Sequence, residues 1–160
     1  MRILGIDPGL NITGYGVLDE HLGKPKIVES GVVRSTKDLD FAARLKEIHD
    51  GVAEIVDQYR PAIVVVEQLY AHYKHPRTAI LMGHARGVAL LAATRHDAQI
   101  ISYSATRIKK TITGHGHATK EQMQRTIQAE LGLAVIPEPP DVADALAVAL
   151  CCFYLRKSPA

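Results

Sequence analysis

The segment Ile63–Glu67 reads IVVVE, and it constrains the fold more than any other stretch of this chain. Four β-branched residues in a row, with no polar residue among them, are typical of a strand buried on both faces. Apolar residues recur at helical spacing before it, over residues 41–59, and after it, over residues 77–96. A doubly buried strand between two helices predicts an α/β sheet with helices on both faces.

Four further strands are expected around this one. Residues 2–7, 13–18 and 27–34 are separated by short connections, which favours an antiparallel meander, and residues 99–103 form a last short strand. Further helices are expected after the capping residues Ser104 and Thr119, the second of them closing at Gly132, and over residues 141–154. We therefore expect a single domain over residues 1–160, with a five-stranded mixed sheet of three antiparallel and two parallel strands.

The composition is that of an ordinary globular domain. Of the 160 residues, 47% are hydrophobic and 22% charged, and a net charge of +2 is too small to indicate nucleic-acid binding by itself. No run approaches the length of a membrane span, which is about 18 apolar residues, and the N-terminus lacks the layout of a signal peptide. The adjacent Cys151 and Cys152 lack the spacing of a zinc site or a disulfide framework. We expect a soluble, cytoplasmic protein with buried thiols and no membrane contact.

Four carboxylates stand at the ends of predicted elements, two at the ends of apolar strands and two at the start of a helix. Asp7 and Glu67 each end an apolar strand, and parallel neighbouring strands bring such residues to the same sheet edge, where ligand sites of open α/β sheets collect. Asp141 and Asp144 are three residues apart, so they share one face at the start of an apolar helix. Like charges at that spacing repel, and a bridging cation would remove the repulsion.

Each acid also has a simpler interpretation. Asp141 could cap its helix or favour the helix dipole, Glu67 could be the last solvent-facing residue of its strand, and Asp7 before Pro-Gly could belong to a turn. The conjunction of all four favours a metal site. Carboxylate oxygens without a Cys/His ligand set suit Mg²⁺, with Mn²⁺ as a substitute, and two such ions roughly 4 Å apart can clamp a phosphodiester.

Five short motifs follow one another along the chain: GIDPG at 5–9, TGYG at 13–16, EQ at 67–68, GHARG at 83–87 and DVADALA at 141–147. In this order and without large gaps, the series resembles the RuvC-type Holliday-junction resolvases. The resemblance implies a ribonuclease H-like fold and a homodimer. It also implies a magnesium-dependent endonuclease that makes paired symmetric nicks in four-way DNA junctions during recombination and repair.

The same resemblance assigns roles to the four acids. Asp7, Glu67, Asp141 and Asp144 match the family's catalytic, metal-holding residues, with two ions per subunit and a metal-activated water as the nucleophile. Some members carry histidine at the place of Asp141, so this chain has the all-carboxylate version. The resemblance further implies 5′-phosphate and 3′-hydroxyl ends and cooperation with a branch-migration motor complex.

A local basic segment lies between Ser104 and Arg125, where five Lys or Arg residues face a single Glu. It contains TGHGHATK, a glycine-histidine stretch before a helix N-terminus, where backbone N–H groups and lysines suit a phosphate. A solvated helix face is the alternative. The candidate DNA contacts are Lys109, Lys110, His115, His117 and Lys120. By resemblance, Lys109 and Lys120 lie near the active site. The two histidines could instead bind a metal or simply face solvent.

The loop after Glu67 combines aromatic and basic residues, and Tyr70, Tyr73, Lys74 and Arg77 are further candidate DNA contacts. Family members often have Phe where this chain has Tyr70, and the following AHYKHPR also departs from the family pattern. Tyr70 can still stack on a base, because stacking on an aromatic ring tolerates most sequences. The departure therefore bears on cleavage preference rather than on the chemistry.

Two pairs of glycines have more than one interpretation. Gly83 and Gly87 allow close helix approach, either to this chain's own sheet or, as the resemblance implies, across a dimer interface. Gly14 and Gly16 are expected to form a bend or bulge, or to leave room for a DNA backbone.

Two rival functions are weighed against the nuclease. GIDPG also resembles the phosphate loop of actin-like ATPases, but those enzymes need a second domain and a second loop, for which 160 residues leave no room. A non-catalytic junction-binding module is the other rival. It would gain nothing from four clustered acids beside DNA, since like charges repel.

Overall fold

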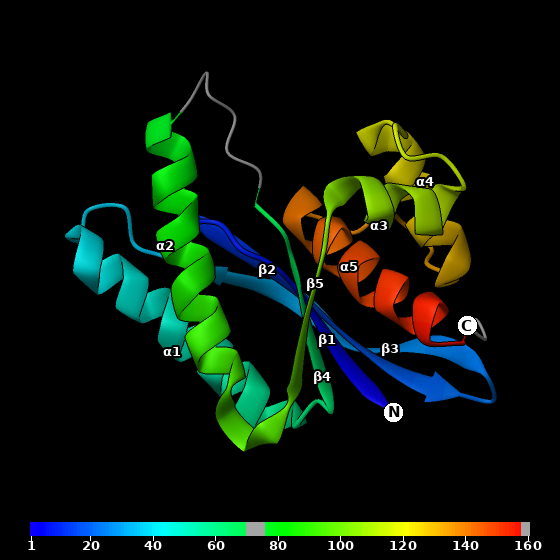
Figure 1. Cartoon of the computed structure of the whole chain (residues 1–160), viewed down its shortest axis with the longest axis horizontal. Coiled ribbons are helices and arrows are strands. Elements are labelled where there is room, and N and C mark those ends of the chain that lie inside the picture. Colours follow the sequence, from blue (N-terminus) through cyan, green and yellow to red (C-terminus); the bar gives the residue numbers. More distant parts are fainter. Residues whose placement is uncertain (70–75, 158–160) are drawn as a thin grey trace.

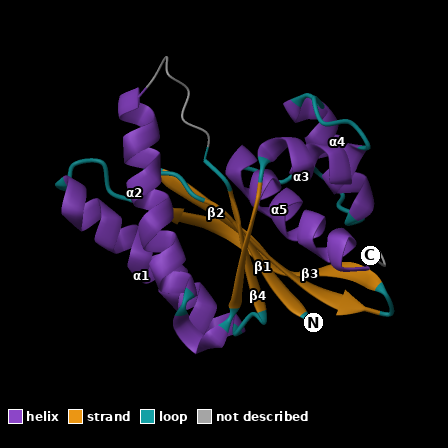
Figure 2. Ribbon diagram, viewed as in Figure 1, coloured by secondary structure: helices purple, strands orange, loops and turns teal. Residues whose placement is uncertain are grey.

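The computed structural model describes residues 1–69 and 76–157, and it has the five-stranded mixed sheet expected from the sequence (Figures 1 and 2). The strands are β1 Arg2–Asp7, β2 Ile12–His21, β3 Lys24–Arg34, β4 Ile63–Glu67 and β5 Gln99–Tyr103. The helices are α1 Phe41–Tyr59, α2 Pro76–Ala93, α3 Ala105–Thr113, α4 Lys120–Glu130 and α5 Pro140–Lys157.

The sheet order is β3-β2-β1-β4-β5, so β1 is the central strand and β4 lies between β1 and β5. β1, β2 and β3 pair antiparallel, whereas β4 runs parallel to both β1 and β5. The isoleucine and the three valines of β4 are all buried, as a strand covered on both faces requires.

Helices cover both faces of the sheet (Figure 2). α1 and α2 pack on one face, over a core that includes Leu4, Val64 and Val66. α3, α4 and α5 lie on the other face, over a core that includes Ile3, Val65 and Leu146. Cys151 and Cys152 are buried free thiols in α5, which confirms that expectation.

Glycines of β1 and β2 let α5 lie directly on the sheet. A Cβ added at Gly5 would stand 2.2 Å from the backbone oxygen of Ala145, and one at Gly16 would stand 2.6 Å from Leu146 Cδ2. At Gly14 the nearest atom would be the backbone oxygen of Asp141, at 2.0 Å. The expectations for Gly14 and Gly16 were therefore wrong: the space belongs to α5, and the register irregularity of β2 lies at Val17/Leu18.

The predicted helix boundaries needed two corrections. α2 ends at Ala93 rather than at residue 96, because His96 and Asp97 have φ values of 58° and 56°, and the chain forms a 3₁₀ turn there. α5 begins at Pro140 and continues to Lys157. The caps at Ser104 and Thr119 are confirmed, the second as a capping box with Gln122. None of the helices within residues 1–69 and 76–157 has the length and apolar character needed to cross a membrane.

Candidate active site

Asp7 and Glu67 lie at the same edge of the sheet. Each is the last residue of its strand, and β1 and β4 are parallel neighbours whose pairing ends at Ile6 and Val66, one residue earlier. Asp7 itself pairs with Gly14 of β2. The expectation that the two strand-end acids share one edge is confirmed.

Asp141 and Asp144 reach this edge from the first turns of α5. The close approach of α5 to Gly14, the partner of Asp7, sets the start of the helix directly over the end of β1. Both aspartates are half-buried, whereas the residues that follow them on α5 are buried. The packing of α5 on the sheet therefore places Asp141 and Asp144 beside Asp7 and Glu67.

Lysines from the two neighbouring helices face this acid pair. Lys120, the first residue of α4, places its Nζ 3.3 Å from Asp144 Oδ2. A cavity of about 250 Å³ opens here, lined by the polar residues Glu67, Lys109, Lys120 and Asp144 and by an apolar floor that includes Ile108 and Met123. The cavity therefore presents both charged and apolar groups.

Burial and mutual repulsion raise the pKa of three of these acids. The pKa of Asp7 rises to about 7, mainly through burial and then through the charges of Asp144, Glu67 and Asp141. Burial and the charge of Asp144 raise the pKa of Glu67, which Lys109 lowers in part. Burial likewise raises the pKa of Asp144, and Lys120 opposes that rise. The two lysines therefore compensate the negative charge only partly.

The donor set fits a hard divalent cation. Four carboxylates offer only oxygen ligands, which Mg²⁺ and Mn²⁺ prefer, and the raised pKa values mark a site where added positive charge is favourable. As the side chains stand, no three His, Cys, Asp or Glu residues within the described ranges converge closely enough to coordinate one ion. Asp7, Glu67, Asp141 and Asp144 are the residues that could hold such an ion.

Comparison with known proteins decides the family. The family model described as crossover junction endodeoxyribonuclease RuvC matches residues 3–152. The chain is 46% identical over 157 residues to the protein of that name from Rhodopirellula baltica, covering 98% of this chain and 88% of the relative. It is 42% identical over 154 residues to the one from Legionella pneumophila, covering 96% and 87%. This chain belongs to the RuvC family.

Solved structures agree with that assignment. Thermus thermophilus RuvC in complex with a Holliday junction substrate superposes with a TM-score of 0.88 at 34% identity, covering 98% of this chain and 95% of that one. A yeast mitochondrial Holliday junction resolvase has a TM-score of 0.65 at 14% identity, covering 95% and 77%, which is a likeness of fold alone. The ribonuclease H-like resolvase fold expected from the resemblance is confirmed.

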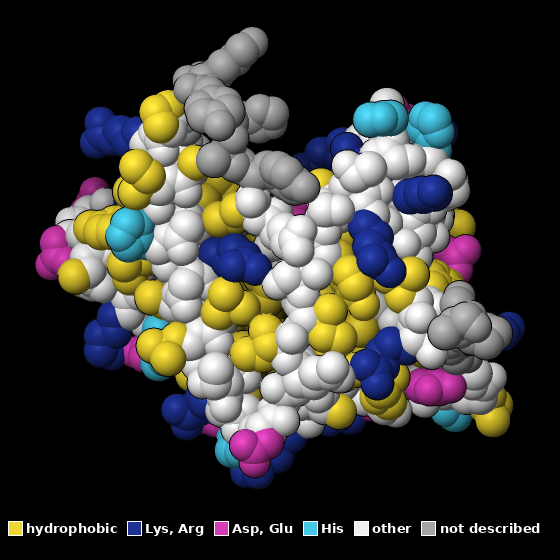
Figure 3. Space-filling view, viewed as in Figure 1, with side chains coloured by type: hydrophobic (Ala, Val, Ile, Leu, Met, Phe, Trp, Pro, Cys, Tyr) yellow, Lys and Arg dark blue, Asp and Glu magenta, His cyan; other side chains and the backbone are white. Residues whose placement is uncertain are grey.

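The remaining candidate DNA contacts of this RuvC family member are spread over several elements. Lys109 is half-buried on α3, and Lys110 is exposed on the same helix. His115 and His117 are exposed between α3 and α4, with ring centroids 6.1 Å apart. Figure 3 shows histidine side chains at the outer tip of the α3–α4 unit and lysine or arginine side chains along its flank. Among the described residues, no third ligand joins the two histidines in a metal-binding group.

The structure describes only part of the loop after Glu67. Tyr70, Tyr73 and Lys74 lie outside the described residues, so their predicted DNA contacts stay predictions. Arg77 is exposed in the first turn of α2.

Gly83 and Gly87 face away from the sheet of this RuvC family member. A Cβ at either position would meet nothing within 4 Å, and the residues of α2 that pack inward are Ala85, Ala89, Ala92 and Ala93. The interpretation that these two glycines pack closely on the chain's own sheet is therefore wrong. They line an open groove of about 500 Å³ together with Leu45, Ile80, His84 and Val88.

The sequence analysis missed the residues that hold the loop after Asp7. Thr13 is fully buried, and its hydroxyl donates to the carbonyl of Gly9 at 2.9 Å and accepts from the N–H of Gly9 at 3.3 Å. Arg44 of α1 donates to Asn11 Oδ1 and to the carbonyl of Leu10. The one available signal was the threonine that opens TGYG, a polar residue inside an apolar strand.

Proposed function

We propose that this chain is a structure-selective endonuclease that resolves four-way (Holliday) DNA junctions by paired symmetric nicks. The observation that carries the proposal is the gathering of Asp7, Glu67, Asp141 and Asp144 at one sheet edge, beside Lys109 and Lys120, in a chain that matches the RuvC family over nearly its whole length. The solved RuvC complex with a Holliday junction supports the same substrate for this chain.

Asp7, Glu67, Asp141 and Asp144 would hold Mg²⁺, two ions per subunit, with Mn²⁺ as a substitute. When bound, such ions supply Lewis acidity that makes a water molecule nucleophilic and neutralises charge on the phosphate. The carboxylates fix the place of the reaction on two strand ends and a buried helix. Lys120, which lies 3.3 Å from Asp144 Oδ2, would stabilise the negative charge that develops on the phosphate. The products carry 5′-phosphate and 3′-hydroxyl ends.

Contacts to the DNA backbone come from Lys109, Lys110, Lys120, His115 and His117, with Arg77 from the start of α2. These basic groups lie on α2, α3, α4 and the loop between α3 and α4, and two of them, Lys109 and Lys120, line the same cavity as Glu67 and Asp144. Tyr70, Tyr73 and Lys74 are proposed as contacts to a distorted strand. Affinity that rests on such contacts falls as salt rises.

We further propose that two copies pair through the outer face of α2, on which Gly83 and Gly87 leave an open groove. Two active sites related by a two-fold axis suit a substrate that is cut in two strands. The dimer would act in the cytoplasm on junctions supplied by a branch-migration motor complex. Residues 1–160 form one nuclease domain.

A synthetic four-way junction and a linear duplex of the same arm sequence test this function. With Mg²⁺, the protein should nick two opposed strands of the junction and leave the duplex intact, and a DNA ligase should seal the products without prior treatment. Tight junction binding without nicks in either Mg²⁺ or Mn²⁺ would favour the binding module instead. Equal cutting of the duplex would contradict structure selectivity.

A further inference from the structure

Arg86 lies on α2 within GHARG, a motif to which the sequence analysis assigned roles only for the glycines. Its half-buried side chain reaches from the helix to the end of the sheet. Nε donates to the backbone carbonyl of Glu67 at 3.0 Å, and Nη2 donates to Ser102 Oγ at 2.8 Å. One guanidinium therefore joins α2 to the last residue of β4 and to β5.

The carbonyl of Glu67 needs this donor because β1 has none to give. Pairing of β1 with β4 ends at Ile6 and Val66, and Asp7 pairs with β2. The next residue, Pro8, has no backbone N–H, and the N–H of Gly9 donates to Thr13 Oγ1. A buried carbonyl without a donor is unfavourable, so the side chain of Arg86 takes the place that the turning strand leaves open.

The second contact fixes the direction of the guanidinium. β4 stays paired with β5 to its end, since the N–H of Gln68 donates to the carbonyl of Tyr103 at 2.9 Å. Ser102 on β5 holds the other arm of the planar fork, and two bonds from one rigid group define its orientation. Arg86 binds the backbone of Glu67 rather than its carboxylate, which leaves both carboxylate oxygens available to a cation.

We propose that Arg86 is a positioning residue for Glu67: it supplies the hydrogen bond that β1 withdraws at Pro8, and so holds the Glu67 carboxylate in the orientation that binds metal. The inference rests on the proposed function of the four acids. Partners that orient metal ligands in this way affect metal affinity or activity by about 10- to 100-fold when they are removed.

Arg86→Met removes both donors and keeps an apolar stem of similar length. Calorimetric titration of the DNA-free protein with Mn²⁺ should show an affinity about 10- to 100-fold weaker than in the wild type. Junction cleavage under single-turnover conditions should slow by a similar factor and recover in part at higher Mg²⁺. The junction Kd in EDTA should stay within about twofold, because the DNA-contacting lysines are untouched. Arg86→Lys keeps one donor, so its Mn²⁺ affinity and cleavage rate should fall between those of the wild type and Arg86→Met.

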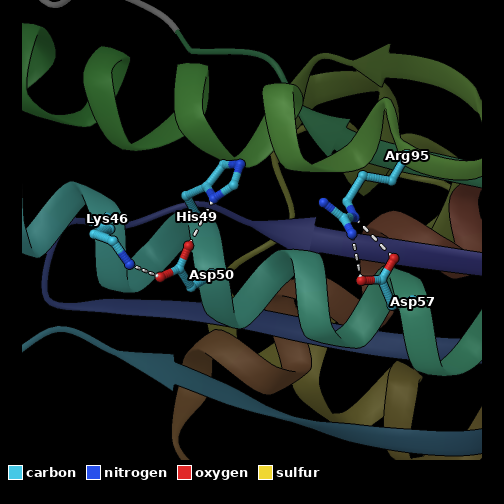
Figure 4. Close-up of polar contacts among 5 residues, drawn as sticks. All are labelled: Lys46, His49, Asp50, Asp57 and Arg95. Atoms are coloured by element: carbon cyan, nitrogen blue, oxygen red, sulfur yellow. Dashed lines mark hydrogen bonds and ion pairs between the residues drawn. The ribbon is translucent and has the colours of Figure 1, made fainter.

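Arg95→Met is the matched control. Arg95 also donates two hydrogen bonds, to Asp57 at 2.9 and 2.8 Å, beside the Lys46–Asp50–His49 contacts of α1 (Figure 4). It precedes β5, so it lies a strand length of about 16 Å from the Glu67 end. This variant should leave Mn²⁺ affinity and cleavage unchanged.

Ser102→Ala is a second test of the positioning role, and it applies even if Arg86→Met does not fold. It frees one arm of the guanidinium and should weaken Mn²⁺ binding about three- to tenfold. Wild-type Mn²⁺ affinity in Arg86→Lys and Ser102→Ala would overturn the inference, as would equal losses in Arg86→Met and Arg95→Met. A wild-type protein that neither binds Mn²⁺ nor cuts junctions would overturn the proposed function itself.

Discussion

At Asp7, burial and three neighbouring carboxylates act in the same direction on one ionisable group. They raise its pKa to about 7, from 3.8 for an unperturbed aspartate. Between these two values the folded state holds a proton that the unfolded state has lost. Stability of the metal-free protein therefore falls as pH rises from about 4 to 7, and it stays lower above that range.

Asp7→Asn should remove this loss of stability at high pH, because asparagine does not ionise. In EDTA at pH 8 the variant should unfold at higher urea concentration than the wild type, by a free energy on the order of 2–4 kcal/mol. At pH 4.5 the two proteins should differ little, because Asp7 is then mostly protonated in the folded state. Equal destabilisation of the variant at both pH values would contradict the assignment of the raised pKa to Asp7.

Among individual residues, the four acids could be predicted from the sequence, but the residues that hydrogen-bond to the backbone around them could not. Asp7 and Glu67 could be recognised because the end of an apolar strand is visible in the chain itself. Arg86 and Thr13 could not, since their roles depend on partners that only the tertiary fold brings near. Arg86 is 19 residues from Glu67, and nothing local marks the pair.

Among the elements, α5 determines whether the proposed metal site is complete, because it carries two of the four acids. Its position depends on glycines that allow direct contact with β1 and β2. The strand at residues 63–67 could be predicted from its unbroken β-branched run, but the contact of α5 with Gly5 could not. Sequence patterns show which face of an element is apolar and not which backbone atoms meet. The end of α2 was missed for a similar reason, since nothing in the pattern marks the positive φ of His96.

Gly5→Ala should therefore be severely destabilising. The added methyl group would stand 2.2 Å from the backbone oxygen of Ala145, and a backbone atom cannot move aside cheaply. We expect a loss of about 3 kcal/mol in the free energy of unfolding, as for strongly overpacked cores. Urea denaturation measures it directly.

Gly83→Ala is the control for that change. Its Cβ would meet nothing within 4 Å, so helix propensity alone should stabilise the protomer, by up to about 1 kcal/mol. A Gly5→Ala protein as stable as Gly83→Ala would contradict the direct packing of α5 on β1.

For the whole molecule, the outer face of α2 is the surface that we propose to contact a second copy. Ile80 and Leu91 are 61% and 63% exposed there, beside the groove at Gly83 and Gly87. Figure 3 shows hydrophobic side chains along this flank of the molecule. An exposed apolar surface of this kind supports the proposed contact between two copies.

Ile80→Glu should separate the copies without unfolding them, because an exposed side chain tolerates a charge within the protomer. Gel filtration should show the wild type at twice 17.5 kDa and the variant at 17.5 kDa. Junctions should then receive single rather than paired nicks. Val135→Glu, at a site 73% exposed in the connection before α5, should remain dimeric. A wild-type monomer at micromolar concentration would contradict the proposed pairing.

The most direct measurement compares cutting with binding in Asp7→Asn. Wild type, Asp7→Asn and the exposed control Asp50→Asn are brought to equal occupancy of a synthetic four-way junction, and Mg²⁺ is then added. The account predicts paired nicks from the wild type and from Asp50→Asn, and a bound but uncut junction with Asp7→Asn. Undiminished cutting by Asp7→Asn would contradict the claim that this carboxylate is part of the metal-holding active site.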